Sequence, residues 1–245
     1  EVLAAMTARG ADVNGANVQG QTPLMWAAMS GNIEAIKWLS GHGAKVNAAD
    51  KKGFTPLFFA LRSKVPGAPM ALLNSGADVN AVLSDGTSVM QAAMLVGNPS
   101  FAIEAVSHGA DLKRMDKDGR QVIHLAAMTG SVDLVKILLT KGVDPNTMTV
   151  LPYAPVVVAS AAAVAGVPPR LPIQPMPVPA TPLQFAARAG SVEVMKLLVA
   201  AGAKPDLKGP DGMTVAIAAA GSGHPDAMQY AYEIDPNLDA ISRGK

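Results

Sequence analysis

Glycines recur along this chain at a fixed interval. Four of them lie 33 residues apart and a fifth follows after 60, which is 33 plus 27: Gly43, Gly76, Gly109, Gly142 and Gly202. A second series has the same period, with spacings of 66, 33, 60 and 33: Gly31, Gly97, Gly130, Gly190 and Gly223. Two series with one period indicate a tandem array of one supersecondary unit, which grows by stacking and has no central globular core.

Each unit contains two short helical patterns. The first begins with a capping residue, often followed by Pro, and contains small residues that let helices approach closely; these segments are 22–28, 55–61, 87–93, 121–127, 181–187 and 214–220. The second has apolar residues at helical spacing, as in 33–40, 132–140 and 192–200. A glycine of the first series closes it, an extended piece such as Gly-Ala-Asp-Val-Asn follows, and Asp and Gly supply a tight turn at 50–53, 85–86, 118–119 and 211–212.

The chain resembles the ankyrin repeat in four features that occur together: Thr-Pro-Leu, the Ala pair, Gly-Ala-Asp-Val-Asn and the 33-residue period. The resemblance covers nearly all of residues 1–245 except roughly 148–180. It implies an all-α solenoid of stacked helix–turn–helix units with projecting β-hairpin fingers. We expect one ankyrin-repeat domain over residues 1–245, with about six full repeats and partial terminal ones. Because both ends look truncated, we also expect an excerpt of a longer array.

Three places depart from the regular unit. Lys64 stands where other repeats have the turn glycine, so we expect a remodelled turn and a following helix that starts at Pro69. The next repeat, aligned on Thr87, has one residue fewer in its finger and one more before Gly97. The finger between Asn146 and Thr181 is longer by 27 residues, hydrophobic and rich in Pro. This insertion favours polyproline II with one short helix around 156–165, and its low charge predicts that it packs against something.

Composition narrows the function classes. A net charge of +1 and the absence of a dense basic stretch argue against nucleic acid as a partner. No cysteine is present, which excludes disulfides and thiolate metal sites. The uncharged stretch 148–169 is interrupted by prolines, so we do not expect a membrane span. The Ala-, Pro- and Met-rich composition suggests a bacterial protein, and cytoplasmic and exported locations are not distinguished.

The histidines do not indicate a metal site or a catalytic site. None of them has a second ligand at i+3 or i+4, and we expect structural roles for all four: His42, His108, His124 and His224. His124 occupies the ankyrin histidine position, where the resemblance implies hydrogen bonding between turns. No nucleophile elbow and no phosphate-binding loop is present. We therefore expect no catalytic residues, no metal and no cofactor.

The resemblance also implies where a partner would bind, namely on the finger tips and the exposed positions of the first helices. Carried over by position, one row is Trp26, Phe59, Gln91, Leu125, Phe185 and Ala218, and the next is Met29, Arg62, Met94, Met128, Arg188 and Gly221. Charges at the finger tips are Lys51, Lys52, Lys117 and Arg120. These rows would form an apolar strip of the kind that marks binding surfaces. The alternative is that the larger residues only shield the stack.

Three hypotheses follow. The first is a non-catalytic scaffold that binds a protein or peptide through its concave surface and finger tips. The second is an accessory subunit or appended domain of a larger bacterial assembly, enzymatic or not, with the insertion as a docking arm. The third is that the loop 150–180 folds back and occupies the groove itself.

Overall fold

The computed structural model describes residues 9–63, 65–150, 179–210 and 212–235. Within these residues, twelve helices follow one another in six pairs. The pairs are α2 (Pro23–Ser30) with α3 (Ile33–Gly41), α4 (Pro56–Arg62) with α5 (Gly67–Asn74), α6 (Val89–Leu95) with α7 (Pro99–Ser107), α8 (Val122–Met128) with α9 (Val132–Thr140), α10 (Pro182–Arg188) with α11 (Val192–Ala200), and α12 (Val215–Ala220) with α13 (Pro225–Ile234).

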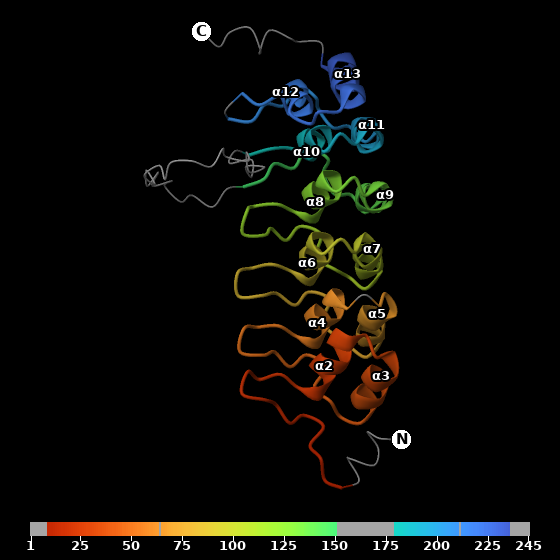
Figure 1. Cartoon of the computed structure of the whole chain (residues 1–245). Helices are drawn as coiled ribbons and strands as arrows, with labels where there is room; N and C mark the ends of the chain where they lie inside the picture. The colour runs from red at the N-terminus through yellow and green to blue at the C-terminus, as the bar shows by residue number, and fades with distance from the viewer. Residues whose placement is uncertain (1–8, 64, 151–178, 211, 236–245) are drawn as a thin grey trace, which may run out of the picture.

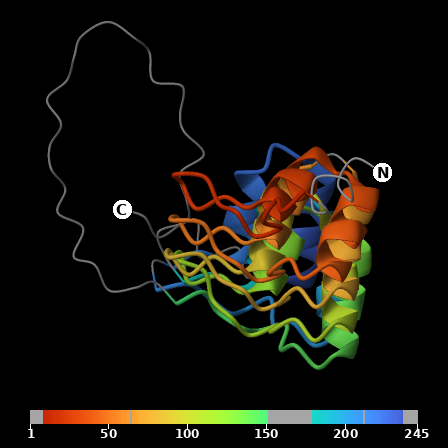
Figure 2. The same cartoon turned by 90° about the horizontal axis from the view of Figure 1, so that it is seen from below.

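The pairs stack into two columns. The first helices form one column and the second helices form the other, and the fingers project from the first-helix side (Figure 1). Seen along the stack, the fingers of successive repeats point the same way (Figure 2). Neighbouring first helices contact one another along the array, from α2 against α4 to α10 against α12. The expected all-α solenoid is therefore confirmed.

The first helices are short, so their stability must come from caps and from packing. At Thr22, Ser88 and Thr181 the N-cap side chain accepts a hydrogen bond from the backbone of the third helical residue, and that residue's side chain in turn accepts from the N-cap N–H. Alanines of these helices, Ala28, Ala93 and Ala186, are fully buried. Small buried side chains let the helices of adjacent repeats lie close together.

The fingers are tight turns rather than long ladders. In three of them an Asn or Asp side chain accepts two backbone N–H bonds inside the turn, and these residues are Asn17, Asp50 and Asp116. The described residues contain no regular strand, and the antiparallel pairing found there is an isolated bridge between Val82 and Ser88. The hairpin connections are thus present with minimal strand character.

Asparagines join one repeat to the next. The Asn80 side chain donates to the Gly109 carbonyl and accepts from the Asp111 N–H, with distances of 3.1 and 2.7 Å. The same two bonds recur at Asn14, Asn47 and Asn146. Lys113 occupies the equivalent position in the repeat between Asn80 and Asn146, so one link of this series is missing.

The insertion does not interrupt the stack. Asn146 reaches across it to the Gly202 carbonyl at 3.0 Å. Thr149 and Ala180 clamp its two ends: the Thr149 N–H donates to the Ala180 carbonyl, and the Ala180 N–H donates to the Thr149 hydroxyl. Asp50 and Phe54 make the same pair of bonds in an ordinary finger. The extra residues therefore replace a finger tip, while the polyproline II, helix and packing predictions for 151–178 lie outside the described residues.

Two boundaries differ from the sequence expectation. Ser88 rather than Thr87 caps α6, so this repeat keeps the regular count of 33 from Thr55 and to Gln121. The Thr87 N–H is instead bonded to the Asp85 side chain. Helix α5 begins at Gly67, so Pro69 lies inside its first turn and does not start it.

Candidate functional site

Five large apolar side chains are exposed along the first helices and the turns that follow them. They are Trp26 (51% exposed), Met29, Leu95 (56%), Val96 (50%) and Met128. Phe59 is half-buried beside them and Arg62 is exposed. Arg62 and the half-buried Arg188 are the formal charges of the six first helices, which carry no carboxylate. We call the surface formed by Trp26, Met29, Phe59, Arg62, Leu95, Val96 and Met128 the first-helix face.

Two residues that we predicted for this surface are buried, because the repeat was aligned on Thr87 and not on Ser88. Gln91 is 1% exposed and Met94 is 3% exposed, so neither contributes to the surface. Because Ser88 is the cap, the positions equivalent to Trp26 and Met29 are Ala92 and Leu95. The regular count of 33 residues from Thr55 would have identified Leu95 and its neighbour Val96.

Larger residues in the first predicted row shield the stack. Leu125 is fully buried, and Phe185 and Ala218 are also buried. The Phe185 ring lies edge-on to the His124 ring, with the centroids 5.5 Å apart. For this half of the array the shielding interpretation describes the residues better than the surface interpretation does.

The position of Gln91 has a different task, which is to hold the next finger. Its amide nitrogen donates to the Arg114 and Arg120 carbonyls at 3.1 and 3.2 Å. Gln184 makes the equivalent bonds to the Leu207 and Met213 carbonyls. In both repeats the amide oxygen also accepts the N-cap N–H, so one side chain joins a helix start to the following finger.

His124 occupies the same position and acts in the same way. Its Nδ1 accepts from the Gln121 N–H at 3.0 Å, which leaves the proton on Nε2 to donate to the Thr147 carbonyl at 3.0 Å. Burial lowers the pKa of His124 from 6.5 to about 4, because the charged imidazolium is poorly solvated there. This residue is a neutral structural anchor, as the sequence suggested.

The finger-tip charges divide into two kinds. Lys51 and Lys52 are exposed, and within the described residues no carboxylate lies within ion-pair distance of either. Arg120 is instead held by Asp116 at 2.9 Å and Asp118 at 2.7 Å, with only 17% of its side chain exposed. Lys117 is exposed and lies 3.7 Å from Asp118. Arg120 therefore stiffens its own finger, which corrects its assignment as a solvated charge.

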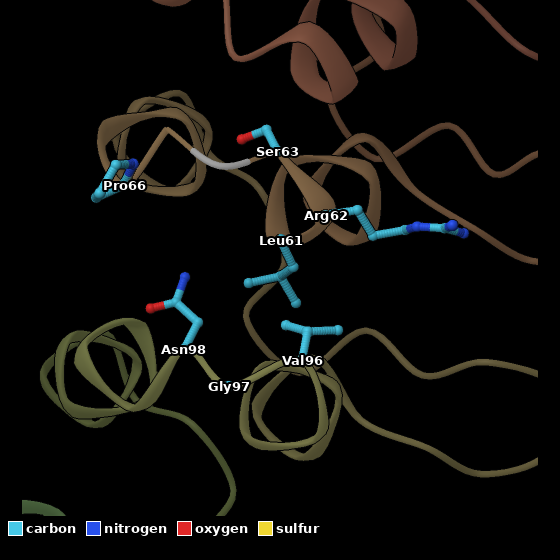
Figure 3. A pocket seen from close by; sticks show the side chains of 7 residues that line it. All are labelled: Leu61, Arg62, Ser63, Pro66, Val96, Gly97 and Asn98. Atoms are coloured by element: carbon cyan, nitrogen blue, oxygen red, sulfur yellow. The ribbon is translucent and has the colours of Figure 1, made fainter.

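A groove of about 490 Å³ opens beside the first-helix face. It lies between the α4–α5 turn and the α6–α7 turn, and is lined by Leu61, Arg62, Ser63, Pro66, Val96, Gly97 and Asn98. Leu61 and Val96 face each other across it, and Arg62 points out toward the finger side of α4 (Figure 3). Sequence reasoning did not find this groove.

The remodelled turn accounts for the groove. In the preceding repeat, Gly31 ends α2 in a left-handed conformation (φ 70°), and Asn32 caps α3. After α4 the chain is extended at Ser63 (ψ 143°), and α5 starts without a side-chain cap. The Val65 side chain packs so closely on Gly31 that a Cβ there would overlap it. The turn thus leans toward the preceding repeat and leaves space toward Val96 and Asn98.

Comparison with protein families agrees with this architecture. The family model described as ankyrin repeats (3 copies) matches residues 1–82, 67–149 and 172–240. The chain belongs to the ankyrin-repeat family. A comparison with curated proteins found no match. Ankyrin repeats are generally protein-interaction modules and are generally non-catalytic.

The described residues contain neither a cluster of metal-binding side chains nor a helix that could span a membrane. Among the described residues of this ankyrin array, no three His, Asp or Glu side chains gather closely enough to hold a metal ion. None of the helices that the structure describes combines the length and the apolar character needed to cross a bilayer.

Proposed function

We propose that this ankyrin array is a non-catalytic scaffold that binds a protein or peptide through its first-helix face and its finger tips. The observation that supports this proposal is the row of exposed apolar side chains on helices that carry no carboxylate. Exposed Trp and Met side chains provide large contact areas, and Met adapts to the shape of a partner. Trp26, Met29 and Met128 are the expected anchors, joined by Leu95 in place of Met94.

The exposed lysines of the fingers have a second role in this proposal. Lys51 and Lys52 are exposed on a finger, and the fingers project from the first-helix side of the stack (Figure 1), so these lysines would attract acidic segments and orient them. Arg188 lies at the position equivalent to Arg62 and belongs to the same proposed surface. Arg120 has no direct role, because Asp116 and Asp118 already hold it.

A peptide selection tests the proposal. A phage library of random dodecapeptides without Trp is selected on the immobilised 245-residue chain, and the most enriched peptide is synthesised. We expect Trp26→Ala to weaken its binding by about ten-fold or more, as truncation of a central aromatic anchor commonly does.

The matched control lies on the other column of helices. Lys37 is exposed on α3, and Lys37→Ala should leave the affinity unchanged. Absence of any enriched peptide, or equal loss of affinity in both variants, would contradict binding through the first-helix face.

The accessory-subunit hypothesis has its own support. The Thr149–Ala180 clamp joins the two ends of the insertion within a finger, and the fingers project from the first-helix side of the array (Figure 1). In a larger assembly this segment would act as a docking arm. Pull-down experiments with and without residues 151–178 test this, since loss of a specific partner on deletion is expected only for a docking arm.

A further inference from the structure

We propose that the groove between the α4–α5 and α6–α7 turns is a specificity pocket for an acidic residue that is adjacent to a bulky apolar residue in a foreign peptide. The apolar side chain would enter between Leu61 and Val96, and the carboxylate would bind Arg62. This inference rests on the proposed peptide-binding function and names the chemistry of the partner.

The walls of the groove are suited to an apolar side chain. Leu61 and Val96 point toward each other, and Pro66 lies farther along the groove (Figure 3). Val96 is half-exposed, and Leu95 next to it is the most exposed large apolar residue of the first-helix face. The groove has a volume of about 490 Å³, which is ample for one apolar side chain. An inserted side chain would remove this apolar area from water.

The charges around the groove favour a carboxylate. Arg62 is exposed, and among the described residues no carboxylate lies within ion-pair distance of it. The four helices α4, α5, α6 and α7 carry one carboxylate, Glu104, which lies late in α7 and does not line the groove. The planar guanidinium of arginine matches a carboxylate with two parallel hydrogen bonds.

Besides Arg62, one polar side chain of the lining, Asn98, offers a hydrogen-bond donor to a ligand. The Asn98 side-chain oxygen already accepts from the Phe101 N–H at 3.1 Å, which leaves its amide nitrogen as a donor on the groove side (Figure 3). The Ser63 hydroxyl donates to the Ala60 carbonyl at 2.8 Å and so does not serve as a donor to a ligand. Asn98 thus presents a donor on one side of the Leu61–Val96 pair, and Arg62 presents its guanidinium on the finger side of that pair, where the carboxylate next to the inserted apolar side chain would bind (Figure 3).

The same argument separates a foreign peptide from the chain's own insertion. Residues 151–178 contain no Asp and no Glu, so they have nothing to pair with Arg62. They would place at most apolar side chains in the groove. Charge complementarity thus favours a partner that brings a carboxylate of its own.

Sequencing of the dodecapeptides selected on the full chain tests this proposal. We expect Asp or Glu next to Leu, Ile, Phe or Met in the enriched peptides. With Arg62→Glu the preference for acidic residues should disappear, and the affinity for a synthetic enriched peptide should fall by about ten-fold or more. Lys37→Glu makes the same change of charge on α3 and should retain the preference.

Two further variants keep the test independent of folding. Arg62→Gln removes the charge with a milder change, and Val96→Asp places an acid in the groove without altering Arg62. Both should lower the affinity for the acidic peptide, while circular dichroism and the urea midpoint report whether each variant is folded.

The outcomes distinguish the two proposals. Enriched peptides without an acidic preference, or with affinity that Arg62→Gln and Val96→Asp leave unchanged, would overturn the groove assignment and leave the proposed scaffold function standing. Enriched peptides that match segments of this chain itself would identify its own insertion or a second copy as the occupant, and would also overturn the assignment. No enrichment at all would overturn both proposals.

Discussion

The first helices and the second helices of the array use their exposed positions differently. The second helices expose charged side chains such as Glu34, Lys37 and Glu104, as expected for a face that only meets water. The first helices expose Trp26, Met29, Leu95 and Met128 instead. The first helices bury other side chains in the core, as α8 does from Val122 to Ala127, so the exposed apolar side chains are additional to those that pack the stack. A surface that keeps apolar side chains in water without a packing reason is the one we assign to binding.

The first prediction measures what burial contributes in the second helices. Leu134 of α9 is fully buried, and Leu134→Ala should lower the free energy of unfolding by about 2–5 kcal/mol, because it removes apolar contacts and leaves a cavity. Urea unfolding followed by circular dichroism gives the value. A loss below about 1 kcal/mol would show that the two columns do not share a tightly packed core.

The second prediction uses the pH dependence of His124. Its pKa is about 4 when folded and 6.5 when the ring is solvated, so only the unfolded chain takes up the proton between these values. The free energy of unfolding should therefore fall as the pH drops from about 6.5 to 4. Between pH 7.5 and pH 4.5 this residue should contribute a loss of about 2–3 kcal/mol.

The control for this prediction is the substitution His124→Gln, because two other repeats have Gln at the equivalent position. Gln91 and Gln184 do the work of His124 without a titrating group, so His124→Gln should keep both hydrogen bonds and remove this part of the pH dependence. Other groups titrate equally in both proteins, and the difference between the two pH profiles isolates His124. Parallel profiles would show that the imidazole is not held neutral in the folded protein.

The third prediction concerns the missing asparagine link. Lys113→Asn should add bonds to the Gly142 carbonyl and the Asp144 N–H, as Asn80 and Asn146 do in the neighbouring repeats. We expect a gain of about 1 kcal/mol, typical of a net intramolecular hydrogen bond. Asn80→Ala, measured in parallel by urea unfolding, should lose a similar amount; a gain from both substitutions would contradict the assigned role.

The smallest effect is expected on the first-helix face. Leu95 is more than half exposed, and Leu95→Ser should change the free energy of unfolding by about 0.5 kcal/mol or less. The two losses in the free energy of unfolding are then compared: a large loss for Leu134→Ala and a small one for Leu95→Ser would show that Leu134 stabilises the core and that Leu95 does not. If Leu95→Ser proved as destabilising as Leu134→Ala, the apolar residues of the face would belong to the core.

Much of the fold could be predicted because each repeat contains the same local sequence signals. The period, the capping residues and the glycines identified the helical pairs and the place of the insertion. The cap of α6 was misplaced because Thr87 and Ser88 are adjacent and both can cap a helix. In the folded protein the Ser88 hydroxyl accepts the Gln91 N–H, while the Thr87 N–H is bonded to Asp85 within the finger.

The candidate site was less predictable because it depends on contacts between repeats. Whether Leu125 or Phe185 is exposed is decided by the neighbouring helices, which local sequence does not describe. The groove depends on the packing of Val65 against Gly31 of the preceding repeat. The unusual residues around Lys64 predicted a remodelled turn, but they did not predict which repeat the turn would pack against. The pairing of Arg120 was easier to predict from the sequence, since Asp116 and Asp118 lie four and two residues before it.

Tryptophan fluorescence tests the central claim most directly, because the chain has two tryptophans and they lie on different columns. In Trp38→Phe the remaining tryptophan is Trp26 on the first-helix face, and in Trp26→Phe it is Trp38 on α3. Addition of the selected Trp-free peptide should shift the emission of the Trp38→Phe protein to shorter wavelength and leave the Trp26→Phe protein unchanged. A shift confined to the Trp26→Phe protein would place the partner on the second helices and contradict the account.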